Sequence, residues 1–397
     1  MTPLLCKPCA RILKGINPVD KPTALMIASM SGHVSPCMTN ALSSSGSAST
    51  INTSNSKGAT ALWLAASAGQ TAAVQLLLDH GADVSKGMLA ANGGSTPLYC
   101  AAAGGHVDTV KILLQAIQAK QQHHLIDTGN AHHATPLFIA AQHNHVAVMQ
   151  LLLGAGASVE CKSDTGATPL FVAAQNGNVA GVRLLLDKGA DIDAAEQVGA
   201  TPLYATAQGG HHECMLLLLN HLQDKHGNAT KDMLSIRRTD TGATAMYTAC
   251  EGGHVACVLE LLARGADASL GLKDTNYTPL MAAVQFGRAN VVEALMTHGR
   301  VDVNVASVPA GITALYTAAV FGQLECARLL IVQGGADVNA TTSDGFNPLL
   351  AALVRKQAVI AEFLIACGAT SDSSFMGTRG NTIISTWVNG GRRSKRL

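Results

Sequence analysis

The sequence has few charged residues and few aromatic residues. Of its 397 residues, 13% are charged and 4% are aromatic, namely two Trp, five Tyr and seven Phe. An average globular protein has about 25% charged residues. Apolar residues make up 48%, so we expect a folded chain rich in Ala and Leu and not a disordered one. The net charge of +1 excludes bulk attraction to polyanions, and nucleic acid is not expected as a partner.

Long hydrophobic runs are missing as well. A membrane-spanning helix needs about 18 or more consecutive apolar residues, and no run reaches that length. The first 16 residues have no long apolar core behind their basic residues, so we expect no secretory signal. The ten cysteines lack the paired spacing of a disulfide framework, which indicates free, mostly buried thiols in a reducing, intracellular compartment.

Recognisable enzyme motifs are also absent. The chain has no phosphate-binding Gly-x4-Gly-Lys-Ser/Thr loop, no Gly-x-Ser-x-Gly nucleophile elbow and no Gly-x-Gly-x-x-Gly loop after a strand. His212-Glu213 lacks the second His of a zinc-protease helix. We therefore expect no catalytic activity, no cofactor and no small-molecule substrate.

What the sequence does contain is an internal repeat. The string Gly-Ala-Thr-Pro-Leu occurs twice, and looser copies recur 33 to 43 residues apart. A period near 33 residues indicates a solenoid of stacked repeats. The position of the Thr is occupied in turn by Thr23, Thr60, Thr96, Thr135, Thr168, Thr201, Thr244, Thr278, Thr313 and Asn347.

Each copy predicts two helices followed by a polar, hairpin-like stretch. In one copy, Thr168 caps a short Ala-rich helix with Pro169 at its first position, where Pro is tolerated. Gly177 breaks this helix, and a second helix with a run of Leu ends at Lys188-Gly189, with Gly as the left-handed cap. Ala pairs let neighbouring first helices approach closely, and the Leu runs fill the space between repeats. Stacking therefore supplies the hydrophobic core.

These features together resemble the ankyrin repeat family. The family pattern is Gly-x-Thr-Pro-Leu-His-x-Ala-Ala, then Gly-His, Leu-Leu-Leu and Gly-Ala-Asp-Val-Asn. Residues 166–191 follow it closely, and Gly334 to Asn339 reproduce its last part. The resemblance covers roughly residues 20–370 and implies an all-α solenoid of about ten helix-turn-helix repeats. It also implies protein partners, typically bound on a concave face made by the hairpin tips and first helices.

One departure from the family pattern is systematic. The His after Leu is replaced, mostly by an aromatic residue, so we expect its usual hydrogen bonds to neighbouring turns to be missing. The replacing rings should pack under the hairpins. The residues at this position are Trp63, Tyr99, Phe138, Phe171, Tyr204, Tyr247, Met281, Tyr316 and Leu350.

Two groups of residues have the composition of a metal site. Cys6 and Cys9 have zinc-ligand spacing, and His33 and Cys37 could complete a set of four. We favour a structural role for the second pair, since both fall at ordinary repeat positions. A cluster of His between 106 and 145 has the same explanation in part, because His106 and His145 are the family's Gly-His position. We expect no metal.

The chain divides into three parts. Residues 1–20 are either a cap or half of a preceding repeat, 21–370 form the solenoid, and 371–397 form a degenerate cap with a basic tail. The run 392–396 is either a nuclear-import signal or a solvated tail. We therefore expect a cytoplasmic protein that enters the nucleus if this run is a signal.

Three stretches depart from the regular period. A Ser/Thr-rich segment at 43–57 predicts a flexible loop. Longer insertions occur at 118–134 and 220–240. Insertions in repeat proteins map to surface loops, often on the binding face, although neutral loop growth explains them equally well.

Two rows of positions on the expected concave face become bulky in the same repeats. The residue before the Thr and the residue eight after it are small or polar in the earlier copies. Exposed aromatic surface marks interaction sites, so we predict a partner-binding patch there. The alternative is that the rings pack on each other or under the C-terminal cap near Trp387. The predicted patch consists of Tyr277, Phe286, Ile312, Phe321 and Phe346.

A polar row, seven residues after the Thr, extends the predicted surface. Its residues are Gln142, Gln175, Gln208 and Gln285.

The sequence thus favours a non-catalytic scaffold or adaptor for protein partners. The first alternative is the recognition or targeting subunit of an enzyme assembly such as a ubiquitin ligase or phosphatase. The second is a metal-binding regulatory protein.

Overall fold

The computed structural model describes residues 24–31, 51–227 and 230–370. The chain divides into two compact units, Met1–Gln197 and Val198–Leu397. Within the described ranges both units are helical, and the only β-pairing is an isolated bridge. No helix in these ranges combines the length and apolar character needed to cross a membrane.

Several predicted features lie outside the described residues. They are the N-terminal cap or half repeat at 1–20, the C-terminal cap and basic tail at 371–397, residues 43–50 of the Ser/Thr-rich loop, and the candidate zinc ligands. Each of these stays a prediction.

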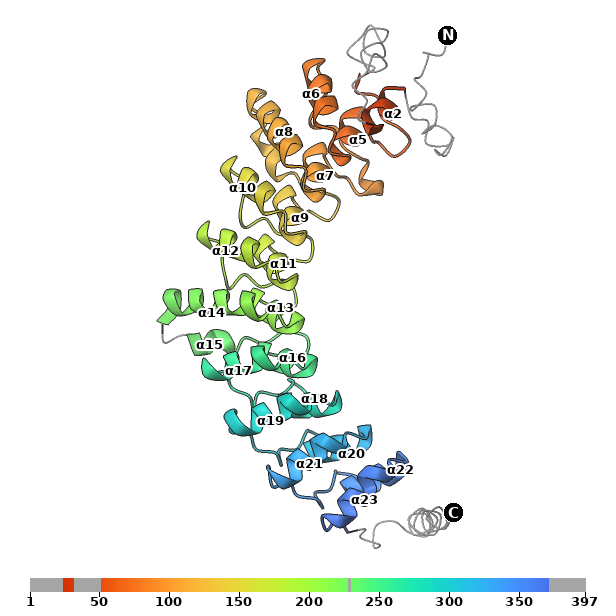
Figure 1. Cartoon of the computed structure of the whole chain (residues 1–397), viewed down its shortest axis with the longest axis vertical. Coiled ribbons are helices and arrows are strands. Elements are labelled where there is room, and N and C mark those ends of the chain that lie inside the picture. The colour runs from red at the N-terminus through yellow and green to blue at the C-terminus, as the bar shows by residue number, and fades with distance from the viewer. Residues whose placement is uncertain (1–23, 32–50, 228–229, 371–397) are drawn as a thin grey trace. The chain divides into compact units, whose positions relative to one another are not determined.

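The N-terminal unit consists of successive helix pairs, with first helices in one layer and second helices in the other (Figure 1). The first helices are α2 (Ala24–Ser31), α5 (Ala61–Ser67), α7 (Pro97–Ala103), α9 (Pro136–Gln142) and α11 (Pro169–Gln175). The second helices are α6 (Thr71–Asp79), α8 (Val107–Ala119), α10 (Val146–Gly154) and α12 (Val179–Asp187). Two 3-10 helices lie in the connections, η2 (Ala90–Asn92) and η3 (His123–Asp127).

The C-terminal unit repeats this arrangement five times. Its first helices are α13 (Pro202–Gly209), α16 (Ala245–Gly252), α18 (Pro279–Gln285), α20 (Ala314–Phe321) and α22 (Pro348–Val354). Its second helices are α14 (His212–His226), α17 (Val255–Ala263), α19 (Ala289–His298), α21 (Leu324–Val332) and α23 (Ala358–Ala366). One further helix, α15 (Thr230–Leu234), follows α14. This all-helical repeat architecture confirms the predicted fold class.

The first helix of each described pair begins at the predicted capping residue. The hydroxyl of Thr168, for example, accepts a hydrogen bond of 3.2 Å from the backbone N–H of Phe171. In the last described repeat the side chain of Asn347 takes this role, at 2.9 Å from the N–H of Leu350. Because a cap satisfies an N–H group that has no partner within the helix, this contact fixes where each helix starts. The predicted register is confirmed.

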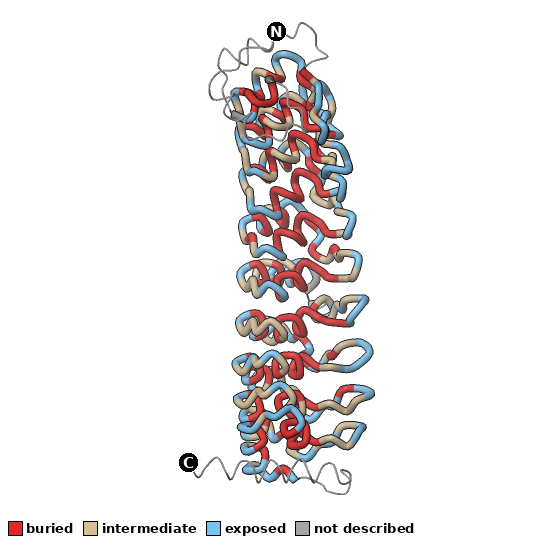
Figure 2. The backbone as a smooth tube through the Cα atoms, turned by 90° about the vertical axis from the view of Figure 1, so that its right-hand side faces the viewer, coloured by how far each residue is buried: buried red, intermediate tan, exposed pale blue. Residues whose placement is uncertain are grey.

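The core of each unit lies between its two helix layers, where Figure 2 shows the buried residues concentrated. The Ala pairs of the first helices are almost completely buried, and so are Leu77, Leu152 and Leu185 of the second helices. Small residues in one layer and Leu in the other let neighbouring repeats pack closely.

The hairpins that lead into each first helix depend on one left-handed residue. Gly166 has φ +80°, a conformation that glycine adopts without steric cost. Two copies carry His133 and Asn276 there instead, with φ 57° and 48°. Neighbouring hairpins are joined by single backbone hydrogen bonds, such as that from Ser343 N–H to Ala310 O at 3.0 Å.

The two predicted insertions are partly helical and packed. In 118–134, helix α8 continues to Ala119, and the following η3 buries Leu125 and Ile126. In 220–240, α14 is extended and followed by α15. The described end of the Ser/Thr-rich stretch is anchored too, because Ile51 is buried and Asn52 Oδ1 accepts a 2.8 Å bond from Asp83 N–H.

The aromatic residues that replace the family's His are mostly buried, as expected. The expectation that hydrogen bonds to neighbouring turns would be missing is wrong at two positions. Trp63 Nε1–H donates to the carbonyl of Ser95 at 3.0 Å, and the hydroxyl of Tyr99 accepts from Asn130 Nδ2 at 3.1 Å. Both partners lie in the hairpin of the next repeat. An indole or phenol carries a polar group as well as a ring, so it can replace the His in this contact.

Candidate functional site

Two predicted site residues, Tyr277 and Gln285, contact each other. Tyr277 lies in the hairpin before α18, and Gln285 is the last residue of that helix. The Tyr277 hydroxyl donates to Gln285 Oε1 at 3.0 Å. Burial raises the pKa of Tyr277, and a hydrogen bond with Thr317 opposes the shift. Both side chains are half-buried, and the Tyr277 hydroxyl also lies 3.5 Å from Thr317 Oγ1 on α20 of the next repeat.

Phe286 and Phe321 lie at the ends of neighbouring first helices. Phe286 follows α18 as its C-cap, and Phe321 is the last residue of α20, which packs against α18. Their exposed fractions are 45% and 48%, which are high values for large apolar residues. These two rings therefore face solvent in the C-terminal unit.

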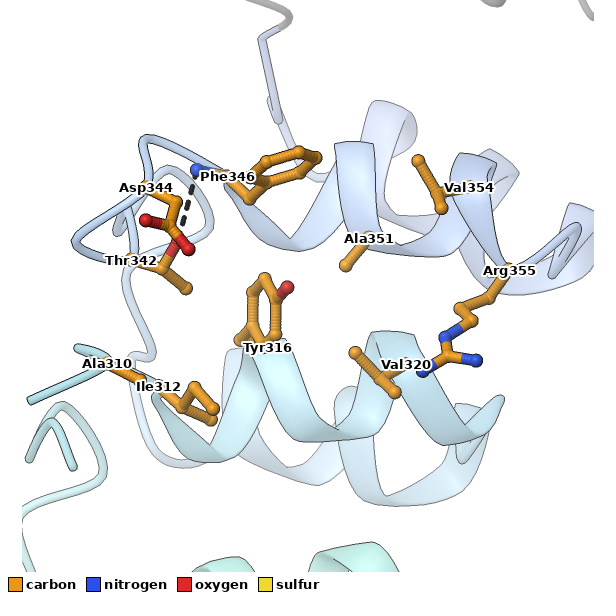
Figure 3. Close-up of a pocket in the computed structure, with 10 residues that line it drawn as sticks. All are labelled: Ala310, Ile312, Tyr316, Val320, Thr342, Asp344, Phe346, Ala351, Val354 and Arg355. Carbon is orange, nitrogen blue, oxygen red and sulfur yellow. Dashed lines mark hydrogen bonds between the residues drawn. The ribbon is translucent and has the colours of Figure 1, made fainter. Parts of the chain in front are cut away.

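Ile312 and Phe346 line one groove between α20 and α22 (Figure 3). The groove encloses about 310 Å³, at the lower end of the range of ligand sites. Its lining residues are Ala310, Ile312, Tyr316, Val320, Thr342, Asp344, Phe346, Ala351, Val354 and Arg355.

Two hairpins and two helices position these side chains. The hairpin before α20 contributes Ile312, and the hairpin before α22 contributes Phe346. The second hairpin is tightened by a 3.1 Å bond from Phe346 N–H to Thr342 Oγ1. In Figure 3 the ring of Tyr316, on α20, points into the space between the helices. The groove thus has apolar walls whose spacing is set by the packing of two neighbouring repeats.

Three polar side chains lie along the groove. Asp344 lies at the hairpin end and Arg355 at the far end of α22, with Tyr316 between them (Figure 3). Burial raises the pKa of Tyr316, the charge of Arg355 lowers it, and that of Asp344 raises it again. Within the described ranges, these three side chains form no hydrogen bond or ion pair with each other or with other residues. They are available to a ligand.

Sequence reasoning did not select Tyr316, Asp344 and Arg355 as site residues. Tyr316 stands in the row that was assigned to packing. The other two carry a signal that a comparison of the copies could have found. The copy at Asn347 is the only one of the ten with an acidic residue three positions before its capping residue and an Arg or Lys eight positions after it.

The predicted glutamines do not line this groove. Gln142 and Gln175 are exposed at the ends of α9 and α11 in the N-terminal unit. Gln208 is exposed near the end of α13 in the C-terminal unit, where its backbone carbonyl accepts a 3.1 Å bond from His254 Nε2.

A smaller cavity of about 240 Å³ lies between α8 and α10 in the N-terminal unit. The insertion at 118–134 forms one side of it through η3. Lys111 and His123 supply polar character, and no acidic residue lines it. The lining residues are Lys111, Leu114, Gln115, Gln118, His123, Ile126, Leu151, Gly154 and Ala155.

Metal-ligating side chains are dispersed in the part of the chain that the structure describes. No three His, Cys, Asp or Glu residues gather there closely enough to hold a metal ion. His132 instead pairs with Asp164 at 3.0 Å. The cysteines in these ranges are free thiols, and Cys214, Cys250 and Cys257 are buried in the C-terminal unit.

The matches between this chain and known proteins fall on its repeats. The family model for ankyrin repeats matches residues 4–88, 25–124, 86–163, 116–196, 194–270, 223–307 and 300–374. The chain is 35% identical over 106 residues to the Caenorhabditis elegans homolog of transient receptor potential cation channel subfamily A member 1. That match spans 27% of this chain and 8% of the relative.

The solved ankyrin repeat domain of human ASB11 is 30% identical, with a TM-score of 0.46. The match covers 56% of this chain and 90% of that one. The family matches extend over nearly the whole repeat region. The chain belongs to the ankyrin repeat family.

Proposed function

We propose that this protein is a non-catalytic scaffold or adaptor that binds segments of partner proteins in the groove between α20 and α22. Ankyrin repeats are protein-interaction domains, which supports the class of function. The observation that carries the proposal is the groove itself, where Ile312, Val320 and Phe346 form apolar walls beside polar groups that have no partner in the described part of the chain.

The exposed apolar surface near the groove supports the same conclusion. Val354 lines the groove with an exposed fraction of 52%. Phe321 directly follows the lining residue Val320 and is 48% exposed. Apolar surface of this kind is removed from water when a partner binds, and aromatic residues contribute strongly to such interfaces.

A substitution that fills the groove tests this function. In the Val354→Arg variant, a long charged side chain would occupy the groove beside Arg355. The matched control is Val359→Arg on α23, a site with an exposed fraction of 65% that does not line the groove. We expect affinity purification with mass spectrometry to lose the main partner with the first variant and to keep it with the second.

Unchanged recovery with both variants would contradict binding in this groove. The identity of the partners also separates the two roles considered from the sequence. A catalytic subunit of a ligase or phosphatase among the proteins lost with Val354→Arg would indicate a recognition subunit instead of a general scaffold.

A further inference from the structure

We propose that the groove between α20 and α22 selects a segment in which an apolar side chain is flanked by a basic residue on one side and an acidic residue on the other. This inference rests on the proposed function, because it names the chemistry of the partner at the same groove. Three observations support it: the positions of the two charged residues, the polar groups that have no partner within the described residues, and the apolar space between the ends of the groove.

The charges lie at opposite ends. Asp344 lies in the hairpin before α22, and Arg355 is the C-cap residue of that helix (Figure 3). Both are exposed, and both influence Tyr316 electrostatically, since Arg355 lowers its pKa and Asp344 raises it. A segment lying along the groove would therefore meet a negative group at one end and a positive group at the other.

The polar groups also lack partners within the described residues. A guanidinium group can donate two parallel hydrogen bonds to a carboxylate, and Arg355 forms no ion pair that would have to be broken first. The Tyr316 hydroxyl adds a donor between the two charged residues. Because both charged side chains are exposed, each contact contributes modestly and is screened by salt.

The space between the two ends is apolar. Ile312, Val320 and Phe346 form its walls, and the small side chain of Ala351 lies on α22. Seven of the other nine copies carry a larger residue at the position of Ala351, for example Ile139, and the remaining two also carry Ala. The small residue helps to leave room for an apolar side chain of the partner at this repeat.

Among the ten copies, the pair of charges that flanks the groove is found at the copy of Asn347 alone. No other copy carries both an acidic residue three positions before the capping residue and an Arg or Lys eight positions after it. The inferred selectivity therefore depends on residues that are particular to this copy and not on residues shared by all repeats.

The test uses a displayed library of random peptides, selected on the immobilised full chain and measured afterwards as synthetic fluorescent peptides. We expect the enriched peptides to share a basic, an apolar and an acidic residue. Arg355→Glu and Asp344→Lys should each weaken binding by at least about tenfold, because each replaces an attraction by a repulsion. Raising the salt concentration should weaken binding of the same peptide to the unchanged protein.

A charge exchange gives a sharper result. Asp344→Arg combined with Arg355→Asp keeps the net charge but exchanges the negative and positive ends of the groove. This double variant should therefore reject the selected peptide. A peptide with its basic and acidic residues exchanged should bind this double variant again. Arg183→Asp combined with Asp187→Arg, at two exposed residues of the N-terminal unit, is the matched control and should leave binding unchanged. Thermal melting of each variant tests whether the fold is retained.

The outcomes separate the two proposals. Peptides that bind through the groove, are lost with Val354→Arg, yet are insensitive to both charge reversals would overturn the inferred charge pattern and leave the proposed function intact. Peptides that survive Val354→Arg, or a library that yields no binder, would overturn both.

Discussion

The hydroxyl of Tyr277 donates a hydrogen bond to Oε1 of Gln285, with 3.0 Å between the two oxygen atoms. This contact joins the hairpin of one repeat to the end of its own first helix, α18. The backbone carbonyl of Gln285 in turn accepts a bond from Gln323 Nε2 of the next repeat at 3.3 Å. The pair therefore links a hairpin, a helix end and the neighbouring repeat.

Removing the Tyr277 hydroxyl should lower stability. We expect Tyr277→Phe to reduce the free energy of unfolding by about 1 kcal/mol, because the half-buried Gln285 amide loses its partner. Tyr316→Phe is the control, since the Tyr316 hydroxyl has no partner in the described ranges, and it should change stability by less than about 0.5 kcal/mol. Denaturant unfolding measures both. Equal losses would contradict a stabilising role for the Tyr277–Gln285 bond.

The exposed rings should matter for binding and not for folding. Truncation of a central interface ring costs about 2 kcal/mol or more, which is roughly a thirtyfold loss of affinity. Phe286→Ala with Phe321→Ala should therefore abolish recovery of the main partner, with the melting temperature nearly unchanged. Gln142→Ala with Gln175→Ala should have less effect.

Two results would go against this prediction. If the double Phe variant unfolds, the rings belong to the core. If it folds and keeps every partner, the two rings lie outside the docking surface. Val354→Arg then tests the groove by itself, and the insertions at 118–134 and 220–240 are the next regions to test.

The second-helix core should be far more sensitive than the cap. Leu185 is completely buried, so Leu185→Ala should cost about 2–5 kcal/mol through lost burial and the cavity left behind. Thr168→Ala should cost about 1 kcal/mol, because the N–H of Phe171 loses its acceptor. Arg183→Ala, on the exposed face of the same helix α12, is the control and should change little. Similar small losses for all three would contradict the repeat register.

The fold was predictable because its determinants are local and occur in every copy. The capping residue, the Ala pair and the Leu run each act within a few residues, so the pattern around Thr168 predicts both of its helices. The groove depends instead on which residues meet across two repeats. Asp344 and Arg355 are separated along the chain, and each resembles an ordinary surface charge until the packing of α20 against α22 places both on one groove.

The predicted binding rows show the same limit. Row position reflects the repeat geometry, and Phe286 and Phe321, in the same row, are both exposed at the ends of their helices. It could not show that Tyr277 turns toward Gln285 and bonds to it, because that depends on a rotamer and on the length of α18. Trp63 and Tyr99 differ from expectation for a similar reason, since their polar atoms reach the next hairpin.

The buried thiols should make the protein less stable in alkali. Cys257 and Cys326 have pKa values raised to about 11 by burial, and burial raises the pKa of Cys250 as well. Above the ordinary value of 9.0, the unfolded chain releases thiol protons that the folded chain retains. The unfolded state then binds fewer protons, so the free energy of unfolding falls as pH rises. This loss should begin near pH 9 and continue through about pH 11.

Melting temperatures between pH 8 and 11 measure this effect in the wild type and in Cys250→Ala. Removal of one thiol should make the decline less steep, because one fewer group titrates differently in the two states. Thr248→Ala is the matched control, since it truncates a buried neighbour that does not titrate. It should lower the melting temperature by a similar amount at every pH and keep the wild-type slope. If the slope is the same for Cys250→Ala and the wild type, proton release from Cys250 does not contribute to alkaline unfolding.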